Sequence, residues 1–341
     1  MTSYAFLRSG YKERQESLHV VTNALVSKVH VVTGENGKQK ATGVKYIKDG
    51  KINNVRARKE IILSAGTIRT PQLLMLSGIG PKNHLKKLKI EVVKDLPGVG
   101  ANLQDHMGLY VYHAIDDYLY ATQSVSTVCE RVTKKDFMKL HIGAMSKLAK
   151  IWYRFNTALL LGVQHPKSKG AIRLNSTNPF NQPIIDPNYL SEEDDIKMYI
   201  EDELNRKQKP FISLVLNRLF SGFRKLEEFE MSQTMKGIGF RLITPEVCNG
   251  SLYTKPPRPD ELYRCYVKNY GVGYHACCTA KIGKENDEMA VVDERLRVRY
   301  VESLRVADAS VMPHETSSNT QAPCYMIGRK ASEMIKEDWN I

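Results

Sequence analysis

A short segment near residue 60 constrains the fold more than any other, because it joins a strand, a turn of small residues and a helix. Glu60–Ser64 is an apolar run that leads into Ala65–Gly66. Thr70 and Pro71 offer an N-cap and a first-turn proline, which predict a helix over Gln72–Ser77. Such a unit lets a phosphate-bearing ligand approach a helix N-terminus, although many α/β proteins carry one without a ligand.

The residues before this unit predict an antiparallel meander. Residues 17–33 are rich in β-branched side chains and lead into the hairpin signal Asn36–Gly37. Residues 41–48 lead into a second hairpin signal, Asp49–Gly50, and residues 51–58 supply a third strand. Together with the strand–turn–helix unit, the meander predicts a mixed α/β fold.

The remainder of the chain predicts further elements without a diagnostic motif. We expect helices over about residues 134–163, 191–206, 261 onward and 323–337, and strands over 291–298 and 304–307. In the last helix, Met326, Ile327, Met334 and Ile335 form an apolar stripe.

Composition bounds the class of protein. With 341 residues and 42% hydrophobic side chains, the chain can bury a large core in two domains or one large one. Its 50 Lys and Arg against 37 Asp and Glu give a net charge of +13. Such a charge is compatible with nucleic acid, an anionic membrane surface or an acidic substrate as a partner. The sequence has no long basic run, zinc-finger spacing or RNA-binding aromatic motif, so a basic solvated surface is favoured and no nucleic-acid partner is expected.

The cysteines and the apolar runs say little about localisation, which stays unknown. Six cysteines without C-x-x-C spacing indicate neither a zinc site nor a thioredoxin-type pair, and no metal is expected. Cys248 and Cys265 could form a disulfide or remain buried thiols. The first 13 residues lack the apolar region of a secretory signal, and the longest apolar run, Ile151–Val163, is too short to span a bilayer.

The chain lacks the phosphate-binding fingerprint of dinucleotide folds. That fingerprint, G-x-G-x-x-G, follows a strand and opens a helix. The G-x-G sequences that begin at Gly78, Gly98, Gly237 and Gly271 have Asn83, Leu103, Leu242 and Ala276 in place of the third glycine.

Three polar residues are candidates for chemistry, each with a structural alternative. His275 follows the flexible stretch Gly271–Tyr274, and a histidine titrates near neutrality as a general base requires, yet a single histidine is more often structural. Asn319 could orient a substrate oxygen or cap the last helix. Asp308 could bind a cofactor hydroxyl or stabilise a turn.

Several segments in order resemble one family, the glucose–methanol–choline (GMC) oxidoreductases. Ala65–Pro81 is similar to the second family signature, and Gly100–His106 is similar to the segment that follows it. Asn178–Leu190 and Leu304–Pro323 resemble the opening and close of the C-terminal region. The chain looks closest to the insect glucose dehydrogenase-like branch, which is related to choline dehydrogenases.

The resemblance implies a domain organisation. Residues 1–106 would form an incomplete FAD-binding domain without its N-terminal βαβ unit, and residues 107–265 a shortened substrate domain with an antiparallel sheet. Residues 266–341 would return to the FAD-binding domain, and residues 168–335 would approximate the family's C-terminal region.

The resemblance also implies a flavoprotein that oxidises the CH–OH group of a small alcohol or sugar. The substrate would pass a hydride to N5 of FAD and its hydroxyl proton to His275, while Asn319 would hydrogen-bond the substrate oxygen. The electron acceptor and the oligomeric state stay unknown. The residues expected to contact the cofactor are Val26, at the adenine, together with Ala65, Gly66, Asp308, Ala309 and Thr320.

The sequence departs from the family at three places. Family members carry a strand, the glycine fingerprint and a helix before the counterpart of Tyr4–Leu7, so we expect an N-terminally truncated member. The stretch between His106 and Gly170 is shorter than in the family, and Ala276–Gly283 replaces the usual Pro-Val-Gly-Thr-Cys-Lys-Met-Gly. The alternative hypothesis is therefore a catalytically inactive remnant or a fragment, at most a binding protein.

Overall fold

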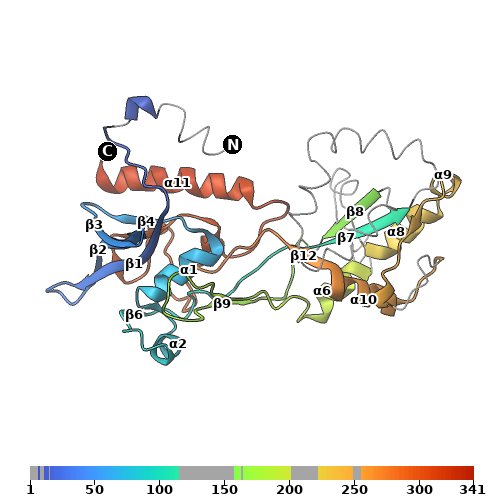
Figure 1. Cartoon of the computed structure of the whole chain (residues 1–341), viewed down its shortest axis with the longest axis horizontal. Helices are drawn as coiled ribbons and strands as arrows, with labels where there is room; N and C mark the ends of the chain where they lie inside the picture. Colours follow the sequence, from blue (N-terminus) through green and yellow to red (C-terminus); the bar gives the residue numbers. More distant parts are fainter. Residues whose placement is uncertain are drawn as a thin grey trace.

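The chain forms two lobes that are joined by extended segments (Figure 1). The computed structural model describes residues 7, 11–14, 16–114, 157–162, 164–200, 222–248 and 255–341. The first lobe holds the larger hydrophobic core and the second lobe a smaller one. This mixed architecture of helices and sheets confirms the predicted fold class.

The first lobe begins with the predicted meander. Strands β1 (Ala24–Thr33), β2 (Gln39–Lys48) and β3 (Lys51–Arg56) pair in antiparallel order, and β13 (Val301–Glu302) adds to β2 in parallel. The first strand starts at Ala24, seven residues later than predicted. Residues from the two ends of the chain thus share one sheet.

A second, parallel pair of strands leads into the first helix. Strand β4 (Ile61–Leu63) pairs with β14 (Leu304–Val306), and helix α1 (Gly66–Leu76) follows β4 directly. The prediction that this helix starts at Gln72 is wrong, because the residue before the helix is Ala65 and Pro71 lies inside it.

The interior proline of α1 is tolerated because another residue replaces its missing N–H. A proline at position 71 cannot donate to the carbonyl of Thr67, four residues earlier. The hydroxyl of Thr279 donates to that carbonyl instead, at 2.6 Å. A contact with a segment 212 residues away therefore completes the helix.

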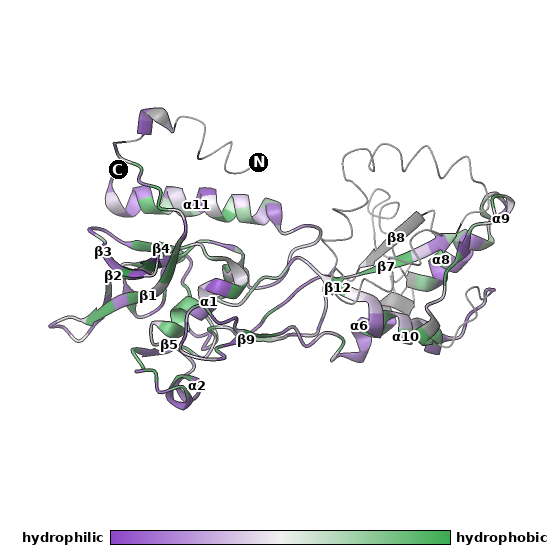
Figure 2. Cartoon of the chain, viewed as in Figure 1, coloured by the Kyte–Doolittle hydropathy of each residue, from purple (hydrophilic) through white to green (hydrophobic). Residues whose placement is uncertain are grey.

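The C-terminal helix α11 (Gln321–Trp339) covers one side of the first lobe. It extends two residues beyond the predicted range at each end. The predicted stripe is wrong at Met326, which is 70% exposed, because the face toward the core runs instead through Ile327, Ala331 and Met334. Figure 2 shows only a few hydrophobic residues along this helix.

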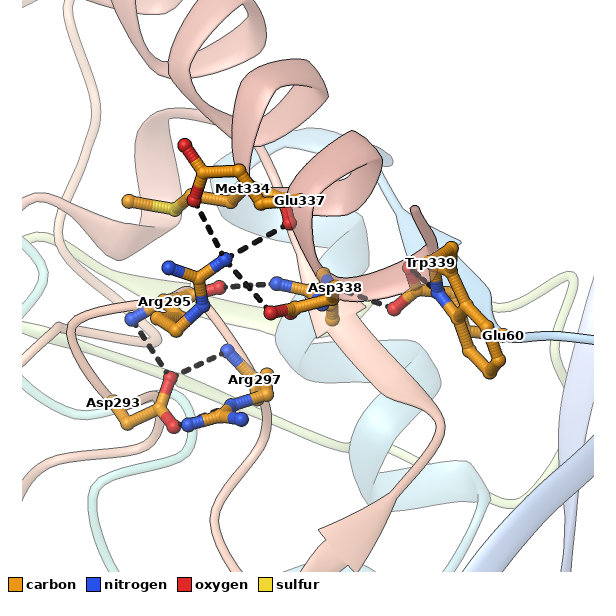
Figure 3. A network of polar contacts seen from close by, with 9 residues as sticks. Glu60, Asp293, Arg295, Arg297, Met334, Glu337, Asp338 and Trp339 are labelled. Atoms are coloured by element: carbon orange, nitrogen blue, oxygen red, sulfur yellow. Dashed lines mark hydrogen bonds and ion pairs between the residues drawn. The ribbon is translucent and has the colours of Figure 1, made fainter. Parts of the chain in front are cut away.

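Buried charges hold the C-terminal end of α11 against the strands (Figure 3). The guanidinium of Arg305, only 3% exposed, donates to Glu60 at 2.6 Å, to the carbonyl of Arg295 at 2.7 Å, and to Asp338. The indole of Trp339 donates to the other oxygen of Glu60 at 2.8 Å.

The second lobe is built on an antiparallel sheet, as predicted. Strand β7 (Met107–Ala114) pairs with β8 (Thr157–Gly162), β11 (Arg241–Leu242) and β12 (Gly271–Gly273). The helix predicted over residues 134–163 is wrong at β8, where pairing with β7 fixes an extended backbone; residues 134–156 lie outside the described ranges.

Helices α6 (Glu193–Ile200), α8 (Gly222–Met231) and α10 (Asp260–Tyr270) pack beside this sheet. Helix α10 confirms the helix predicted from residue 261. Helix α6 confirms residues 193–200 of the one predicted over 191–206, and it starts two residues later than predicted. Cys248 and Cys265 form a disulfide.

The strand predicted over residues 291–298 is wrong. Leu296 has a φ of 63°, which turns the chain, so that Val292 and Val298 form only an isolated bridge. The remaining short elements are a 3-10 helix (Lys12–Arg14), β5 (Ile79–Gly80), α2 (Lys82–Lys87), β6 (Lys94–Asp95), β9 (Ala171–Arg173), β10 (Ile184–Asp186), α9 (Gln233–Gly237), a 3-10 helix (Glu246–Cys248) and the 3-10 helix η4 (Ala309–Val311).

Candidate functional site

The candidate site lies where the two lobes meet. His275 follows β12, which pairs with the start of β7, and His106 immediately precedes β7. The backbone N–H of His275 donates to Oδ1 of Asp105 at 2.6 Å. Strand pairing and this hydrogen bond together place the two histidines beside each other.

The imidazole of His275 stands between two polar side chains. Its Nδ1 lies 3.0 Å from Nδ1 of His106, and its Nε2 lies 3.0 Å from Nδ2 of Asn319. The two histidine rings meet edge to face, with centroids 5.1 Å apart. His275 is half-buried and Asn319 is exposed. The structure thus brings together the two residues predicted to act on a substrate.

Asp105 anchors the segment that carries His275. Its Oδ2 accepts a hydrogen bond of 2.5 Å from the hydroxyl of Tyr189. Burial raises the pKa of Asp105, although the hydrogen bonds from Tyr189 and from the backbone of His275 act in the opposite direction. A Cβ at Gly273 would lie 2.0 Å from the hydroxyl of Tyr189 and 2.2 Å from Oδ2 of Asp105, so only glycine allows this approach.

His106 is held by two further partners, Gln164 and Glu315. Its Nε2 lies 2.8 Å from the carbonyl oxygen of Gln164, and its backbone N–H donates to Oε1 of Glu315 at 2.8 Å. Burial lowers the pKa of His106 to about 4 and raises the pKa of Glu315 to about 8. Both side chains are therefore neutral at pH 7, and the 3.4 Å contact between them is not an ion pair at that pH.

Two of the residues predicted to contact a cofactor line a cavity of about 450 Å³ beside the meander. Val26 lies on its β1 side, and Ala65 lies at the N-terminus of α1. Further lining residues include Ile62 in β4 and its flanking neighbours Glu60 and Ser64.

Asp308 joins α1 to η4. Its Oδ2 accepts hydrogen bonds from the backbone N–H of Gly66 at 2.9 Å and from the hydroxyl of Thr70 at 2.6 Å. Its Oδ1 accepts from the backbone N–H of Ser310 at 2.8 Å. The carboxylate therefore caps two helices, and its contact with a cofactor stays a prediction.

The segment from η4 to α11 combines a small apolar surface with a helix N-terminus that can donate hydrogen bonds. Ala309 is buried in a small apolar cluster with Cys277, Cys278 and Met312. Thr320 precedes α11, whose N-terminus has no side-chain cap and no acidic residue in its first turn. Helix N–H groups left in this state favour hydrogen-bond acceptors and anionic groups. The cavity and this helix end are consistent with FAD.

Sequence reasoning missed the residues that support His275. Asp105 and His106 lie in a segment that resembles the family, but nothing in it indicates their contacts. Gln164 and Glu315 are 58 and 209 residues from His106, and no pattern in one sequence links them.

Comparison with known proteins identifies the family. The N-terminal model of the GMC oxidoreductases matches residues 2–108, and the C-terminal model matches residues 166–206 and 216–328. The chain belongs to the GMC oxidoreductase family.

Among curated relatives, the glucose dehydrogenase [FAD, quinone] of Drosophila pseudoobscura pseudoobscura is 30% identical over 374 residues, which cover 98% of this chain and 55% of that protein. The mitochondrial choline dehydrogenase of Homo sapiens is 34% identical over 339 residues, which cover 87% of this chain and 51% of that protein. The chain spans about half the length of these relatives.

Solved structures share the fold. An FAD-dependent oxidoreductase from Chaetomium thermophilum aligns with a TM-score of 0.71 at 23% identity, covering 98% of this chain and 65% of that chain. Pyridoxine 4-oxidase from Mesorbium loti aligns with a TM-score of 0.67 at 22% identity, covering 98% and 61%. In the described part of the chain, none of the helices has the length and apolarity needed to cross a membrane.

Proposed function

We propose that this chain carries the substrate-facing part of an FAD-dependent oxidoreductase that acts on the CH–OH group of a small alcohol or sugar. The observation that carries the proposal is the pairing of His275 Nε2 with Asn319 Nδ2 at 3.0 Å, at the junction of the two lobes. The names of the relatives, which include a glucose dehydrogenase and a choline dehydrogenase, support this substrate class.

The chain offers several contacts to the cofactor. Val26 and Ala65 would contact FAD at the cavity beside the meander, with Gly66 next to them, and Ala309 and Thr320 would contact it between η4 and α11. When bound, FAD supplies the redox chemistry, which no side chain of the protein can supply.

The protein's own residues position the substrate and accept its proton. The amide N–H of Asn319 would donate to the substrate oxygen and hold the hydroxyl beside His275. The hydroxyl proton then passes to Nε2 of His275, which acts as general base. The hydrogen bond from His275 to Asp105 keeps the base in place during this transfer.

Two measurements test the proposal. The purified chain is titrated with FAD and monitored by its visible absorbance near 450 nm, where flavins absorb through their own ring. Reduction of an artificial electron acceptor is then followed with a panel of alcohols and sugars. We expect flavin binding and turnover with some of these substrates. A folded chain that retains no flavin after this titration would contradict activity of this chain and favour the inactive alternative.

The His275→Gln variant tests the role of the base. A glutamine cannot accept the hydroxyl proton, so kcat should fall by roughly 10²- to 10⁴-fold while FAD binding stays unchanged. His30→Gln is a matched control, because His30 lies on β1 and contacts Asn54 of the meander. Equal turnover of His275→Gln and the unchanged chain would remove His275 from the mechanism.

A further inference from the structure

We propose that His106 is a positioning residue that fixes the tautomer of His275, with the proton on Nδ1 and the lone pair on Nε2. The inference rests on the proposed role of His275 as proton acceptor and adds how that role is set up. Neutral histidine carries one ring proton, and a hydrogen bond at one nitrogen decides where that proton sits.

The nitrogen of His106 that faces away from His275 carries a proton. Nε2 of His106 lies 2.8 Å from the carbonyl oxygen of Gln164. A carbonyl oxygen can only accept a hydrogen bond, so Nε2 must carry a proton.

The nitrogen of His106 that faces His275 is a hydrogen-bond acceptor. The residue is 5% exposed, and burial disfavours the imidazolium. A neutral imidazole with its proton on Nε2 has only a lone pair at Nδ1, so this atom accepts a hydrogen bond. Glu315, 3.4 Å from Nδ1, does not restore the charge, because burial raises its pKa to about 8.

The acceptor on His106 decides which nitrogen of His275 carries a proton. The 3.0 Å contact between the two Nδ1 atoms needs one proton, and only His275 can provide it. Nε2 of His275 therefore has a lone pair directed at the amide of Asn319, which can donate to it. This is the nitrogen that would receive the proton of a substrate hydroxyl. With the opposite tautomer, His275 could not act as base at this position.

The tautomer can be read directly by ¹⁵N NMR of histidine-labelled protein at neutral pH, without FAD or substrate. The signals of His275 are assigned by their loss in His275→Gln. We expect a protonated Nδ1 and an unprotonated Nε2 in the unchanged chain. In His106→Phe the acceptor is lost, and we expect the protonated Nε2 form of His275 to become populated. In His106→Asn the amide oxygen keeps an acceptor near the position of Nδ1, so the original tautomer should persist.

His113→Phe is the matched control. His113 is fully buried, stacks on Phe240 with centroids 4.3 Å apart, and also has a pKa lowered to about 4 by burial. Its replacement should leave the signals of His275 unchanged. A protonated Nε2 on His275 in the unchanged chain would overturn the proposal, and so would a His106→Phe variant that keeps the Nδ1 proton. If His106→Phe does not fold, the smaller His106→Ala removes the same acceptor, and a retained Nδ1 proton on His275 in that variant would also overturn the proposal.

Turnover separates this inference from the proposed function. Where the chain is active, His106→Phe should lower kcat by at least about tenfold with little change in KM, and His106→Asn should recover most of the loss. Failure of the chain to bind FAD would contradict the proposed function and leave the tautomer result intact. An active chain whose His275 carries its proton on Nε2 would contradict both the inference and the base role of this nitrogen, and would leave only the oxidation of alcohols by the chain standing.

Discussion

Single residues in the site are constrained by close packing as much as by chemistry. At Gly273, the hydroxyl of Tyr189 and the carboxylate of Asp105 occupy the space that a side chain would need. The Gly273→Ala variant must displace this hydrogen-bonded pair, so we expect a loss of about 1–3 kcal/mol in the free energy of unfolding. Chemical denaturation measures the change.

A glycine in open space provides the comparison for Gly273. Gly328 lies inside α11, and a Cβ there would meet no atom within 4 Å. Gly328→Ala should therefore stabilise the protein by roughly 0.5–1 kcal/mol, since alanine favours the helix. A Gly273→Ala variant as stable as Gly328→Ala would show that the Asp105–Tyr189 pair can move aside without loss of unfolding free energy.

At the scale of an element, helix α1 depends on the hydroxyl that replaces its missing N–H. Thr279→Val leaves the buried carbonyl of Thr67 without this donor, and we expect a cost of about 1–2 kcal/mol. In a Pro71→Ala background, the new N–H at position 71 can donate to the same carbonyl, so Thr279→Val should cost less. A double-mutant cycle in urea should give a coupling energy above about 0.5 kcal/mol. Additive effects of the two substitutions would contradict this account.

Helix α11 depends on one buried guanidinium at its C-terminal end. Arg305→Met leaves Glu60, whose side chain is 6% exposed, as a buried carboxylate that keeps the hydrogen bond from Trp339 but has lost its cationic partner. We expect a loss of about 3–5 kcal/mol in the free energy of unfolding, because breaking a buried ion pair leaves an uncompensated charge.

Arg329→Met tests the same type of change on the surface of the same helix. Arg329 is 84% exposed and pairs with Glu333, so its loss should cost less than about 0.5 kcal/mol. Thermal and urea unfolding of both variants give the comparison. Equal effects would mean that the charges around Arg305 contribute no more than a surface pair.

These elements also show what the sequence can predict. The meander and the start of α10 were predictable because turn residues and hydrophobic patterns are local signals. The start of α1 was not, since Pro71 has the appearance of a first-turn proline and the compensating Thr279 lies far along the chain. Strand β8 was missed because its pairing with β7, not its composition, fixes its backbone.

At the scale of the whole molecule, the site requires both lobes. His275 and His106 come from the ends of strands in the second lobe, whereas Asn319 precedes the helix that covers the first. The sequence predicted His275 and Asn319 through their family resemblance, and the structure places them together. The sequence could not predict that His106 contacts His275 and Glu315, because such buried polar contacts depend on the packing of distant segments.

Buried titratable groups in both lobes make global stability depend on pH. His106 at the site and His113 in the second lobe have folded-state pKa values of about 4, below the 6.5 of an unperturbed histidine. Between these values the unfolded chain binds more protons, so stability rises with pH. Glu315 acts oppositely, because its folded-state pKa of about 8 lies above the ordinary value of 4.5. The stability that it contributes is fully present below pH 4.5 and is lost as the pH rises to about 8.

Below pH 6.5 the two histidines raise the stability with pH by more than Glu315 lowers it. Above pH 6.5, of these three groups, only Glu315 still changes the stability, and it lowers it. Together they predict a maximum of stability near pH 6.5. Glu315→Gln keeps an oxygen acceptor for the N–H of His106 but cannot ionise. This variant should therefore abolish a decline of about 1–2 kcal/mol in the free energy of unfolding between pH 6.5 and 8. His113→Phe should weaken the rise of stability below pH 6.5 (the acid branch) and leave its decline above pH 6.5 (the alkaline branch) unchanged. Urea unfolding from pH 5 to 8 measures both branches, and an undiminished alkaline decline in Glu315→Gln would show that another group titrates there.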